Sequence, residues 1–581
     1  MARYSSSSVG STPAPSYRSK SPPPAYSYYP AATSSSSSRT LPSERTPLVR
    51  TEYKIRQVHI DIPRPPYARI SEYFFLFLGF AFVVCILCIP IFFLLPKGPV
   101  VPPPPPPIHS IAIVGAGPAG ICAAQHLYHQ AQARGIHVDI TIFESSLLIG
   151  GQLALNSSTG GPVFPYDDST QDPIIAEDIA GTALLWGNPL FTKTTEKILG
   201  DEVQISEAGS QRVSYFTGDQ VVAQTTRPYS KTPYLDWMGL IFRYGSSVWS
   251  AGALAKQGAE LQDLLANHLP LNTPDVAQLM IAAGVFDYVR KSSPTELADR
   301  GIGGAYVSDV LDPEISRVYY ARSTPDVSAL ALMLAAGIED TAAAYQGGEL
   351  LERLEMVLGA ISARVHVRES TEVLGVKHAQ ISEHEAAWLV QYSSSGNGPD
   401  TSIPHQAAPF DKVIIAAPRL DLYAGASAQD VDAASALAYR AAHVALFTVP
   451  RRIDGYGGGD VNQVLFLENA LGGIRELAFV KEVVRIGEDG QSIVEYLYRA
   501  LADDNAREQL ERLDLGITWL YQKKLENAYP YMFPASRFPP FKLSDKGLWW
   551  TSPMHMIAST VDLSCHAGKI VAEQLVSELR R

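Results

Sequence analysis

Residues 110–152 of this 581-residue chain read SIAIVGAGPAGICAAQHLYHQAQARGIHVDITIFESSLLIGGQ. The apolar run at 111–114 predicts a short buried strand, and residues 115–120 follow the pattern G-x-G-x-x-G. Residues 121–133 have the Ala-, Leu- and Gln-rich composition of a helix, and residues 138–143 predict a second strand. The stretch therefore predicts a strand–turn–helix–strand unit of the doubly wound α/β type.

The glycines of this turn each have a separate part in binding a dinucleotide. Gly115 permits the tight turn, Gly117 lets the backbone approach a pyrophosphate, and Gly120 lets the helix pack closely on the strand. Glu144 ends the second strand, 24 positions after Gly120, where a carboxylate accepts hydrogen bonds from ribose hydroxyls. A Gly-rich turn in this context predicts a dinucleotide site.

Two neighbouring features narrow the choice of cofactor. Pro118 and Ala119 open the helix, whose unpaired N–H groups and partial positive charge attract phosphate. Gly150 and Gly151 form a doublet that resembles the second phosphate-side contact of FAD enzymes of the glutathione-reductase and amine-oxidase type. A plain NAD-binding unit does not need this doublet, so we expect FAD.

Composition and charge divide the chain into a tail and a body. The net charge is −12, yet residues 1–70 hold ten Lys or Arg against three acidic residues, so they carry +7 and the remainder −19. An acidic body argues against nucleic acid as a partner. No metal-ligand spacing appears among the four cysteines. Cys122 and Cys565 are expected to be packed thiols, although a disulfide between them stays open.

The Ser-, Pro- and Tyr-rich composition of residues 1–70 predicts a disordered tail. Pro23–Tyr26 (PPAY) resembles the PPxY ligand of WW domains, which makes a WW-domain protein an expected partner. Glu44–Val49 resembles an acidic dileucine-type sorting signal, with Val in place of the second Leu.

A transmembrane helix is expected at 71–96, where residues 73–95 are uncharged and long enough to cross a bilayer. The run is too long and lies too far into the chain for a cleaved signal peptide. The positive charges lie before it, which predicts a type II protein with a cytosolic tail and a lumenal body. A Pro-rich stalk is expected at 97–109, and the sequon at Asn156 fits a lumenal body.

The body, 110–581, is expected to combine a Rossmann-like FAD-binding domain with an inserted α+β substrate domain. The FAD-binding parts are expected at about 110–160, 345–420 and 545–581, and the substrate parts at about 161–344 and 421–544. Within them, the patterns predict helices at 234–248, 327–344 and 349–359 and strands at 365–376 and 411–418.

The closing segment, 547–572 (GLWWTSPMHMIASTVDLSCHAGKIVA), resembles that of prenylcysteine oxidases, also called prenylcysteine lyases. Residues 241–245 (IFRYG) resemble that family's aromatic-Arg-Tyr-Gly segment. Residues 442–448 (AHVALFT) resemble the strand beneath its pocket, and Tyr529-Pro530 its Tyr-Pro element. The resemblance covers roughly 110–578.

The resemblance implies a thioether oxidation. Flavin takes hydride from the prenyl carbon bonded to sulfur, water adds to that carbon, and the adduct gives cysteine and a prenyl aldehyde. O2 reoxidises the flavin and yields hydrogen peroxide, since no second nucleotide unit for NAD(P)H is visible. Prenylcysteine arises in protein breakdown, so a vacuolar or lysosomal lumen is expected. Prenyl length, oligomeric state and the identity of the lumen stay open.

The chain departs from the family pattern at two places. Gly-Gly-Arg becomes Gly150-Gly151-Gln152, and His555 stands where the closing segment usually carries an acid. His555 is a candidate for delivering water, and Arg243 for holding the substrate carboxylate, with a structural salt bridge as its equal alternative. Trp549 and Trp550 are expected in the core. The residues expected to contact FAD are Gly115, Gly117, Pro118, Ala119, Gly120, Glu144, Gly150, Gly151, Gln152, Val373 and Ala558.

Two rival functions remain open. A lumenal flavin amine oxidase would share the fold and the peroxide product. A catalytically inactive membrane scaffold would lack flavin and would recruit partners through its tail.

Overall fold

The computed structural model describes residues 107–153, 210–227, 229–340, 347–382, 385–394, 406–418, 423, 437–458, 460–467, 470, 472–486 and 489–580. The chain divides into two units, 1–102 and 103–581, and all described residues belong to the second. The expected tail, the apolar run at 73–95 and Asn156 lie outside the described residues. Within those residues, none of the helices combines the length and apolar character needed to cross a bilayer.

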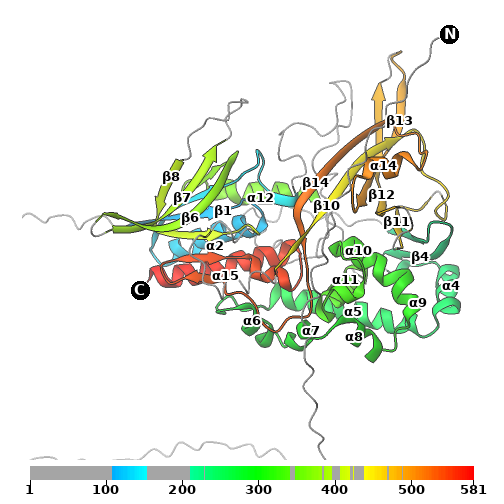
Figure 1. The fold of residues 1–581 in the computed structure, drawn as a ribbon, viewed down its shortest axis with the longest axis horizontal. Coiled ribbons are helices and arrows are strands. Elements are labelled where there is room, and N and C mark those ends of the chain that lie inside the picture. The colour runs from blue at the N-terminus through cyan, green and yellow to red at the C-terminus, as the bar shows by residue number, and fades with distance from the viewer. Residues whose placement is uncertain are drawn as a thin grey trace, which may run out of the picture. The chain divides into compact units, whose positions relative to one another are not determined.

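A six-stranded sheet carries the Gly-rich turn, with the strand order β15-β16-β9-β1-β2-β5 (Figure 1). Neighbouring strands from β16 to β5 run parallel, and β15 pairs antiparallel at the edge. The strands are β1 (Ile108–Val114), β2 (His137–Phe143), β5 (Val365–Arg368), β9 (Lys412–Ile415), β15 (Lys542–Ser544) and β16 (Leu548–Trp550). A parallel sheet with a β-α-β start confirms the predicted α/β class.

Alternating side chains of β1 pack against two different layers. Ile111 and Ile113 lie in the same apolar core as helices α2 (Pro118–Ala133), α12 (Gly347–Ala360) and α15 (Val561–Leu579). Ala112 and Val114 lie in a second core with the three-stranded antiparallel sheet. That sheet consists of β6 (Thr371–Ser382), β7 (Glu385–Ser394) and β8 (Gln406–Phe410). Figure 1 shows α2 and α15 on one side of β1 and these three strands on the other.

Two glycines and a disulfide fix α2 against its neighbours. A Cβ atom on Gly120 would lie 2.0 Å from the Gly115 carbonyl oxygen, and one on Gly568 would lie 2.1 Å from the Ala119 carbonyl oxygen. Cys122 and Cys565 form a disulfide with their Cα atoms 5.2 Å apart. The expectation of two packed thiols was therefore wrong, because α15 lies so close to α2 that the sulfur atoms meet.

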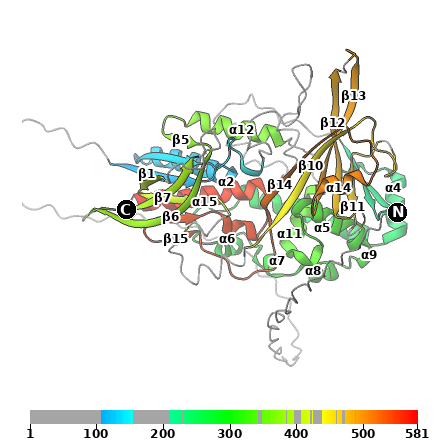
Figure 2. The same cartoon turned by 45° about the horizontal axis from the view of Figure 1, so that its top comes forward.

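A seven-stranded sheet follows in the order β14-β10-β13-β12-β11-β3-β4. Its strands are β3 (Gln211–Phe216), β4 (Val221–Arg227), β10 (Tyr439–Val449), β11 (Gln463–Phe466), β12 (Ile474–Ile486), β13 (Ser492–Ala502) and β14 (Trp519–Pro530). The short helix α14 (Ala506–Glu511) packs on it. Figures 1 and 2 both show β10 and β14 reaching from this sheet to the end of α15.

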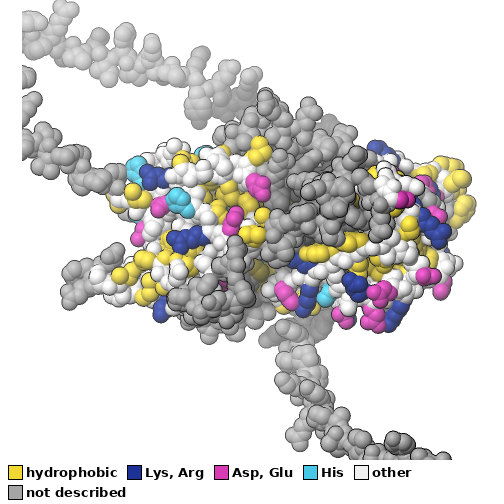
Figure 3. Space-filling view, turned by 90° about the horizontal axis from the view of Figure 1, so that it is seen from above, with side chains coloured by type: hydrophobic (Ala, Val, Ile, Leu, Met, Phe, Trp, Pro, Cys, Tyr) yellow, Lys and Arg dark blue, Asp and Glu magenta, His cyan; other side chains and the backbone are white. Residues whose placement is uncertain are grey.

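A group of helices accompanies this sheet. They are α4 (Tyr234–Tyr244), α5 (Ser247–Asn267), α6 (Val276–Ala282), α7 (Phe286–Arg290), α8 (Ser293–Asp299), α9 (Gly304–Tyr306), α10 (Asp312–Tyr319) and α11 (Ala329–Asp340). Helices α5 and α11 pack against each other. They approach closely at Gly258, where a Cβ would lie 1.8 Å from the Met333 carbonyl oxygen. On the face seen in Figure 3, described basic and acidic side chains are interspersed.

Several predicted boundaries were wrong. The strand expected at 365–376 is two strands, β5 and β6, because the chain turns at Ser370 with a φ of 50°. The helix expected at 234–248 ends at Tyr244, where Gly245 takes a φ of 59°. The strand expected at 411–418 is the shorter β9, Lys412–Ile415. Residue 109, expected as the end of a stalk, already lies in β1, which begins at Ile108.

Candidate cofactor and substrate site

The N-termini of the two long helices α2 and α15 meet at one cavity of about 170 Å3. Its first wall is the Gly-rich turn, with Gly117 to Ala119 and Gly151 to Gln152. Further lining residues are Tyr439 of β10, residues 527–529 of β14, His555 and residues in the first turn of α15. Residues from both sheets therefore share one site.

The turn has the geometry that a pyrophosphate requires. Gly115 has a φ of 102°, and a Cβ there would lie 2.8 Å from the Ala416 carbonyl oxygen, so only glycine fits. Gly117 is the N-cap of α2, and no side chain caps that end of the helix. The helix start, from Gly117 to Ala119, lines the cavity, so an anionic group there would lie at the positive end of the helix dipole. The residues present thus fit a dinucleotide.

Glu144 braces this turn from the end of β2. Its Oε2 accepts a hydrogen bond from the Ala116 N–H at 2.8 Å, and its Oε1 accepts one from the Ser146 N–H at 2.9 Å. The residue is only 6% exposed. Ribose binding by this carboxylate stays a prediction, whereas its support of the turn is visible.

The 150–152 segment ties the turn to the other sheet. The Gly150 N–H donates to the Ala116 carbonyl at 2.8 Å, and Gly151 has a φ of 60°. The Gln152 side-chain amide donates to the carbonyls of Asn527 and Ala528, at 3.2 and 3.0 Å. Gln152 therefore joins the nucleotide turn to β14.

His555 lies in the 3-10 helix Ser552–Met556 and lines the cavity. Its Nδ1 is 2.9 Å from the Tyr439 hydroxyl, and its Nε2 is 3.2 Å from the Ser564 hydroxyl. Burial lowers the pKa of His555 to about 4, so the imidazole is neutral at ordinary pH. Burial also raises the pKa of the Tyr439 hydroxyl.

Helix α15 begins later than the sequence indicated. The opening expected near Ala558 lies at Val561, because the Thr560 hydroxyl caps the helix by accepting from the Leu563 N–H at 3.3 Å. Ala558 is fully buried and is not in the cavity wall. At the start of α15, Thr560 and Ser564 line the cavity, and the prediction of Ala558 missed both residues.

The remaining predicted residues lie away from the cavity wall. Arg243 donates from Nε and Nη2 to Oδ2 of Asp309, at 3.2 and 2.9 Å, which is the salt-bridge alternative. Val373 of β6 is 5% exposed in the core shared with the three-stranded sheet. Trp549 and Trp550 are fully buried, at 0% and 1% exposed. The cavity lining thus does not include these residues. Of the other predicted residues, the lining includes Gly117, Pro118, Ala119, Gly151, Gln152 and His555, and it does not include Gly115, Gly120, Glu144 and Gly150.

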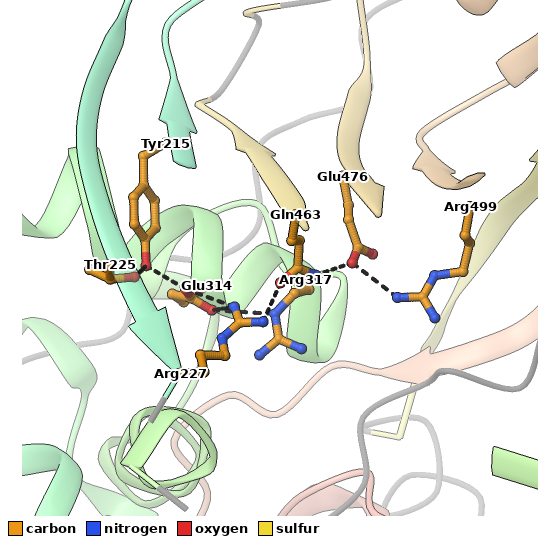
Figure 4. A network of polar contacts seen from close by, with 8 residues as sticks. All are labelled: Tyr215, Thr225, Arg227, Glu314, Arg317, Gln463, Glu476 and Arg499. Carbon is orange, nitrogen blue, oxygen red and sulfur yellow. Dashed lines mark hydrogen bonds and ion pairs between the residues drawn. The ribbon is translucent and has the colours of Figure 1, made fainter. Parts of the chain in front are cut away.

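A buried polar network lies on the substrate-domain side (Figure 4). At its centre, Arg227 holds Glu314 through both carboxylate oxygens, at 3.0 and 2.9 Å, and the Tyr215 hydroxyl donates to Glu314 at 2.6 Å. A second carboxylate, Glu476, accepts from Arg499 at 3.0 Å. The residues drawn are Tyr215, Thr225, Arg227, Glu314, Arg317, Gln463, Glu476 and Arg499. This network ties α10 to the seven-stranded sheet.

Tyr529 connects that network to the cavity. It lines the cavity and stacks on Tyr320, with ring centroids 5.5 Å apart. Burial raises the pKa of Tyr529 to about 12, while the nearby Arg499 acts in the opposite direction. The cavity wall at Tyr529 is therefore backed by a fixed set of buried charges.

Comparison with known proteins identifies a family for the larger part of the chain. The family model described as prenylcysteine lyase matches residues 230–581. Comparison with curated proteins gave no match.

Similar solved structures include two forms of putrescine oxidase. One is a triple mutant from a structure-based redesign of cofactor binding, 14% identical, with a TM-score of 0.48 over 82% of this chain and 100% of that chain. The other is the wild type bound to putrescine, 13% identical, with a TM-score of 0.46 over 81% of this chain and 100% of that chain. With TM-scores below 0.5, this likeness says nothing about what the present chain binds.

Proposed function

Because this chain belongs to the prenylcysteine lyase family, we propose that it is an FAD-dependent oxidase that cleaves the thioether of prenylcysteine to cysteine, a prenyl aldehyde and hydrogen peroxide. One observation carries the proposal: the Gly-rich turn lines a cavity whose other lining residues belong to the part of the chain that the family model matches. A dinucleotide held at the turn would thus lie beside residues of that matched part.

The cofactor would be held by the turn and its support. The N-terminus of α2 would face the diphosphate, Glu144 lies where a ribose would follow, and Gly117 and Gly151 leave room for close approach. When bound, FAD would accept a hydride from the carbon next to sulfur and would be reoxidised by O2. The cavity of about 170 Å3 is smaller than a whole dinucleotide, so the adenosine half would extend past the turn toward Glu144.

The side chains that face the turn suit an apolar thioether. Ala416, Pro418, Val561 and Tyr439 supply largely apolar surface, which would orient a prenyl chain and limit the access of water. Hydride transfer depends mainly on placement, so the site needs few charged groups. The neutral His555 provides a polar group without a buried charge.

We also propose a membrane-anchored protein with its body in the lumen of a vacuole or lysosome and its tail in the cytosol. The apolar run at 73–95 and the charges before it support this orientation. The Cys122–Cys565 disulfide favours an oxidising compartment. In this arrangement, Pro23–Tyr26 would be available to a WW-domain protein.

The test is to purify the full chain and to measure visible flavin absorbance and peroxide production. We expect a yellow protein that releases peroxide and free thiol with farnesylcysteine. Putrescine and other amines serve as the matched substrates of the rival function. A colourless protein, or peroxide with amines alone, would overturn the proposal.

A further inference from the structure

Three hydroxyl and imidazole groups form a hydrogen-bonded chain along the cavity wall. Tyr439 comes from β10, His555 from the 3-10 helix 552–556 and Ser564 from the first turn of α15. The two contacts, Tyr439 Oη to Nδ1 at 2.9 Å and Ser564 Oγ to Nε2 at 3.2 Å, occupy both ring nitrogens. All three residues line the cavity. The hydrogen-bonded chain therefore joins three elements of the cavity wall through one imidazole.

A neutral imidazole has one donor and one acceptor nitrogen, so this chain has two directions. When Tyr439 donates to Nδ1, Nε2 donates to Ser564, and the Ser564 proton is directed away from the ring. When Ser564 donates to Nε2, Nδ1 donates to Tyr439, and the Ser564 oxygen keeps its lone pairs for the cavity. The same serine thus serves as a donor or as an acceptor.

We propose that Tyr439, His555 and Ser564 form a proton relay that takes a proton from the water adding to the oxidised thioether carbon and returns it to the sulfur. This inference rests on the proposed function. Ser564 is the catalytic residue that meets the reacting atoms, His555 holds the proton behind it, and Tyr439 is a positioning residue that sets the ring's tautomer.

With this relay, every proton in the reaction has a source and a destination. After the hydride leaves carbon, the water oxygen bonds to that carbon and gives one proton through Ser564 to Nε2 of His555. The C–S bond then breaks as the adduct's O–H electrons form C=O, and the relay's proton goes to sulfur to make the thiol. The adduct hydroxyl's proton joins the hydride as O2 becomes hydrogen peroxide. Thioether, water and O2 thus give thiol, aldehyde and peroxide.

The lowered pKa of His555 suits a group that accepts a proton and soon releases it. Water bonded to a cationic carbon is a strong acid, so even an imidazole of lowered pKa accepts its proton. The resulting imidazolium is correspondingly acidic and protonates the leaving sulfur readily. The same lowered pKa keeps the group uncharged when no proton is in transit.

The test uses the full chain with Ser564→Ala, His555→Gln and Tyr439→Phe, and with Ser246→Ala as the matched control, since Ser246 is exposed and its side chain does not cap helix α5. In a single turnover with farnesylcysteine, we expect unchanged flavin reduction. Thiol release should slow by roughly 10²–10⁴-fold in Ser564→Ala and His555→Gln and less in Tyr439→Phe. Equal slowing of both steps, or wild-type thiol release in Ser564→Ala, would overturn the relay.

A second measurement, by NMR, does not require catalytic turnover. In protein that contains ¹⁵N-labelled histidine, the His555 signals are identified by their loss in His555→Gln. We expect Ser564→Ala and Tyr439→Phe each to shift the tautomer balance between the two ring nitrogens, and Ser246→Ala to leave it unchanged. An unmoved His555 signal in Ser564→Ala refutes the relay, whereas a wild-type protein without peroxide from farnesylcysteine refutes the proposed function.

Discussion

Cys122 of α2 is bonded to Cys565 of α15, across 443 positions of the chain. The first of these helices begins at the Gly-rich turn, and the first turn of each helix lines the same cavity. Gly568 lies one turn further along α15 and lets its backbone touch Ala119. The bond therefore holds together the two helix ends that define the site.

Removing this bond should lower the stability of the body. We expect Cys565→Ser to reduce the free energy of unfolding by about 2–5 kcal/mol, because the disulfide restricts the unfolded chain. Thermal denaturation with and without reductant measures the effect, and Cys88→Ser is the control. Thiol labelling of the denatured, unreduced protein should modify two of the four cysteines; labelling of all four would show that the bond is absent.

Gly568→Ala should destabilise the contact between α2 and α15. The added Cβ would lie 2.1 Å from the Ala119 carbonyl oxygen, so the helices must separate, at a cost of about 1–3 kcal/mol. Gly359→Ala in α12 is the matched control, since its Cβ meets nothing within 4 Å. Chemical denaturation compares the two variants, and equal midpoints would contradict the close contact.

Gly117→Val should remove flavin while leaving the protein folded. Gly117 has a φ of −78°, which any residue adopts, and its nearest atom is the Gly151 Cα at 3.8 Å from an added Cβ. A branched side chain would then fill the space in front of the α2 N-terminus. We expect a native melting curve with at least a tenfold loss of bound flavin, and flavin at the wild-type level would exclude this position as the diphosphate contact.

Two substitutions of Glu144 should destabilise the protein to different degrees. Glu144→Ala leaves the buried Ala116 N–H without its acceptor, which should cost about 1–3 kcal/mol and loosen the turn. Glu144→Gln keeps one carbonyl acceptor and should cost less. Denaturation and flavin affinity measure the effect of both substitutions. This geometry requires Glu144→Gln to have the smaller effect of the two.

The body should lose stability in acid through His555. Its folded pKa of about 4 lies below the ordinary value of 6.5, so the unfolded chain binds more protons between these values. The free energy of unfolding should therefore fall by about 1–2 kcal/mol from pH 7 to pH 5 on account of this residue. His555→Gln should flatten that dependence, while the exposed control His268→Gln should not. His566, whose pKa burial lowers to about 3, contributes in the same direction and remains in both variants.

The sequence predicted the parts of the site that depend on neighbouring residues. The turn at 115–120, the helix after it and the strand ending at Glu144 each depend on local composition and spacing, and the structure has all three. The α/β class followed from them. His555 was likewise singled out, because it interrupts the pattern of the closing segment.

Contacts between residues far apart in the chain could not be predicted from the sequence in this way. Tyr439 and Ser564 bear no local signal of their meeting at His555, since three elements far apart in the chain bring them together. The start of α15 was placed three residues early because the Thr560 cap is visible only as a hydrogen bond. The disulfide also depended on a distance that spacing along the chain does not give.

The separation of α2 and α15 along the chain has a consequence for biosynthesis. Both helices line the cavity, yet Cys565 of α15 is synthesised 443 positions after Cys122 of α2. Domains generally fold as units, so the cavity cannot be complete before α15, residues 561–579, has been made. A nascent chain that stops before residue 561 would therefore carry the Gly-rich turn without the helix that completes the cavity.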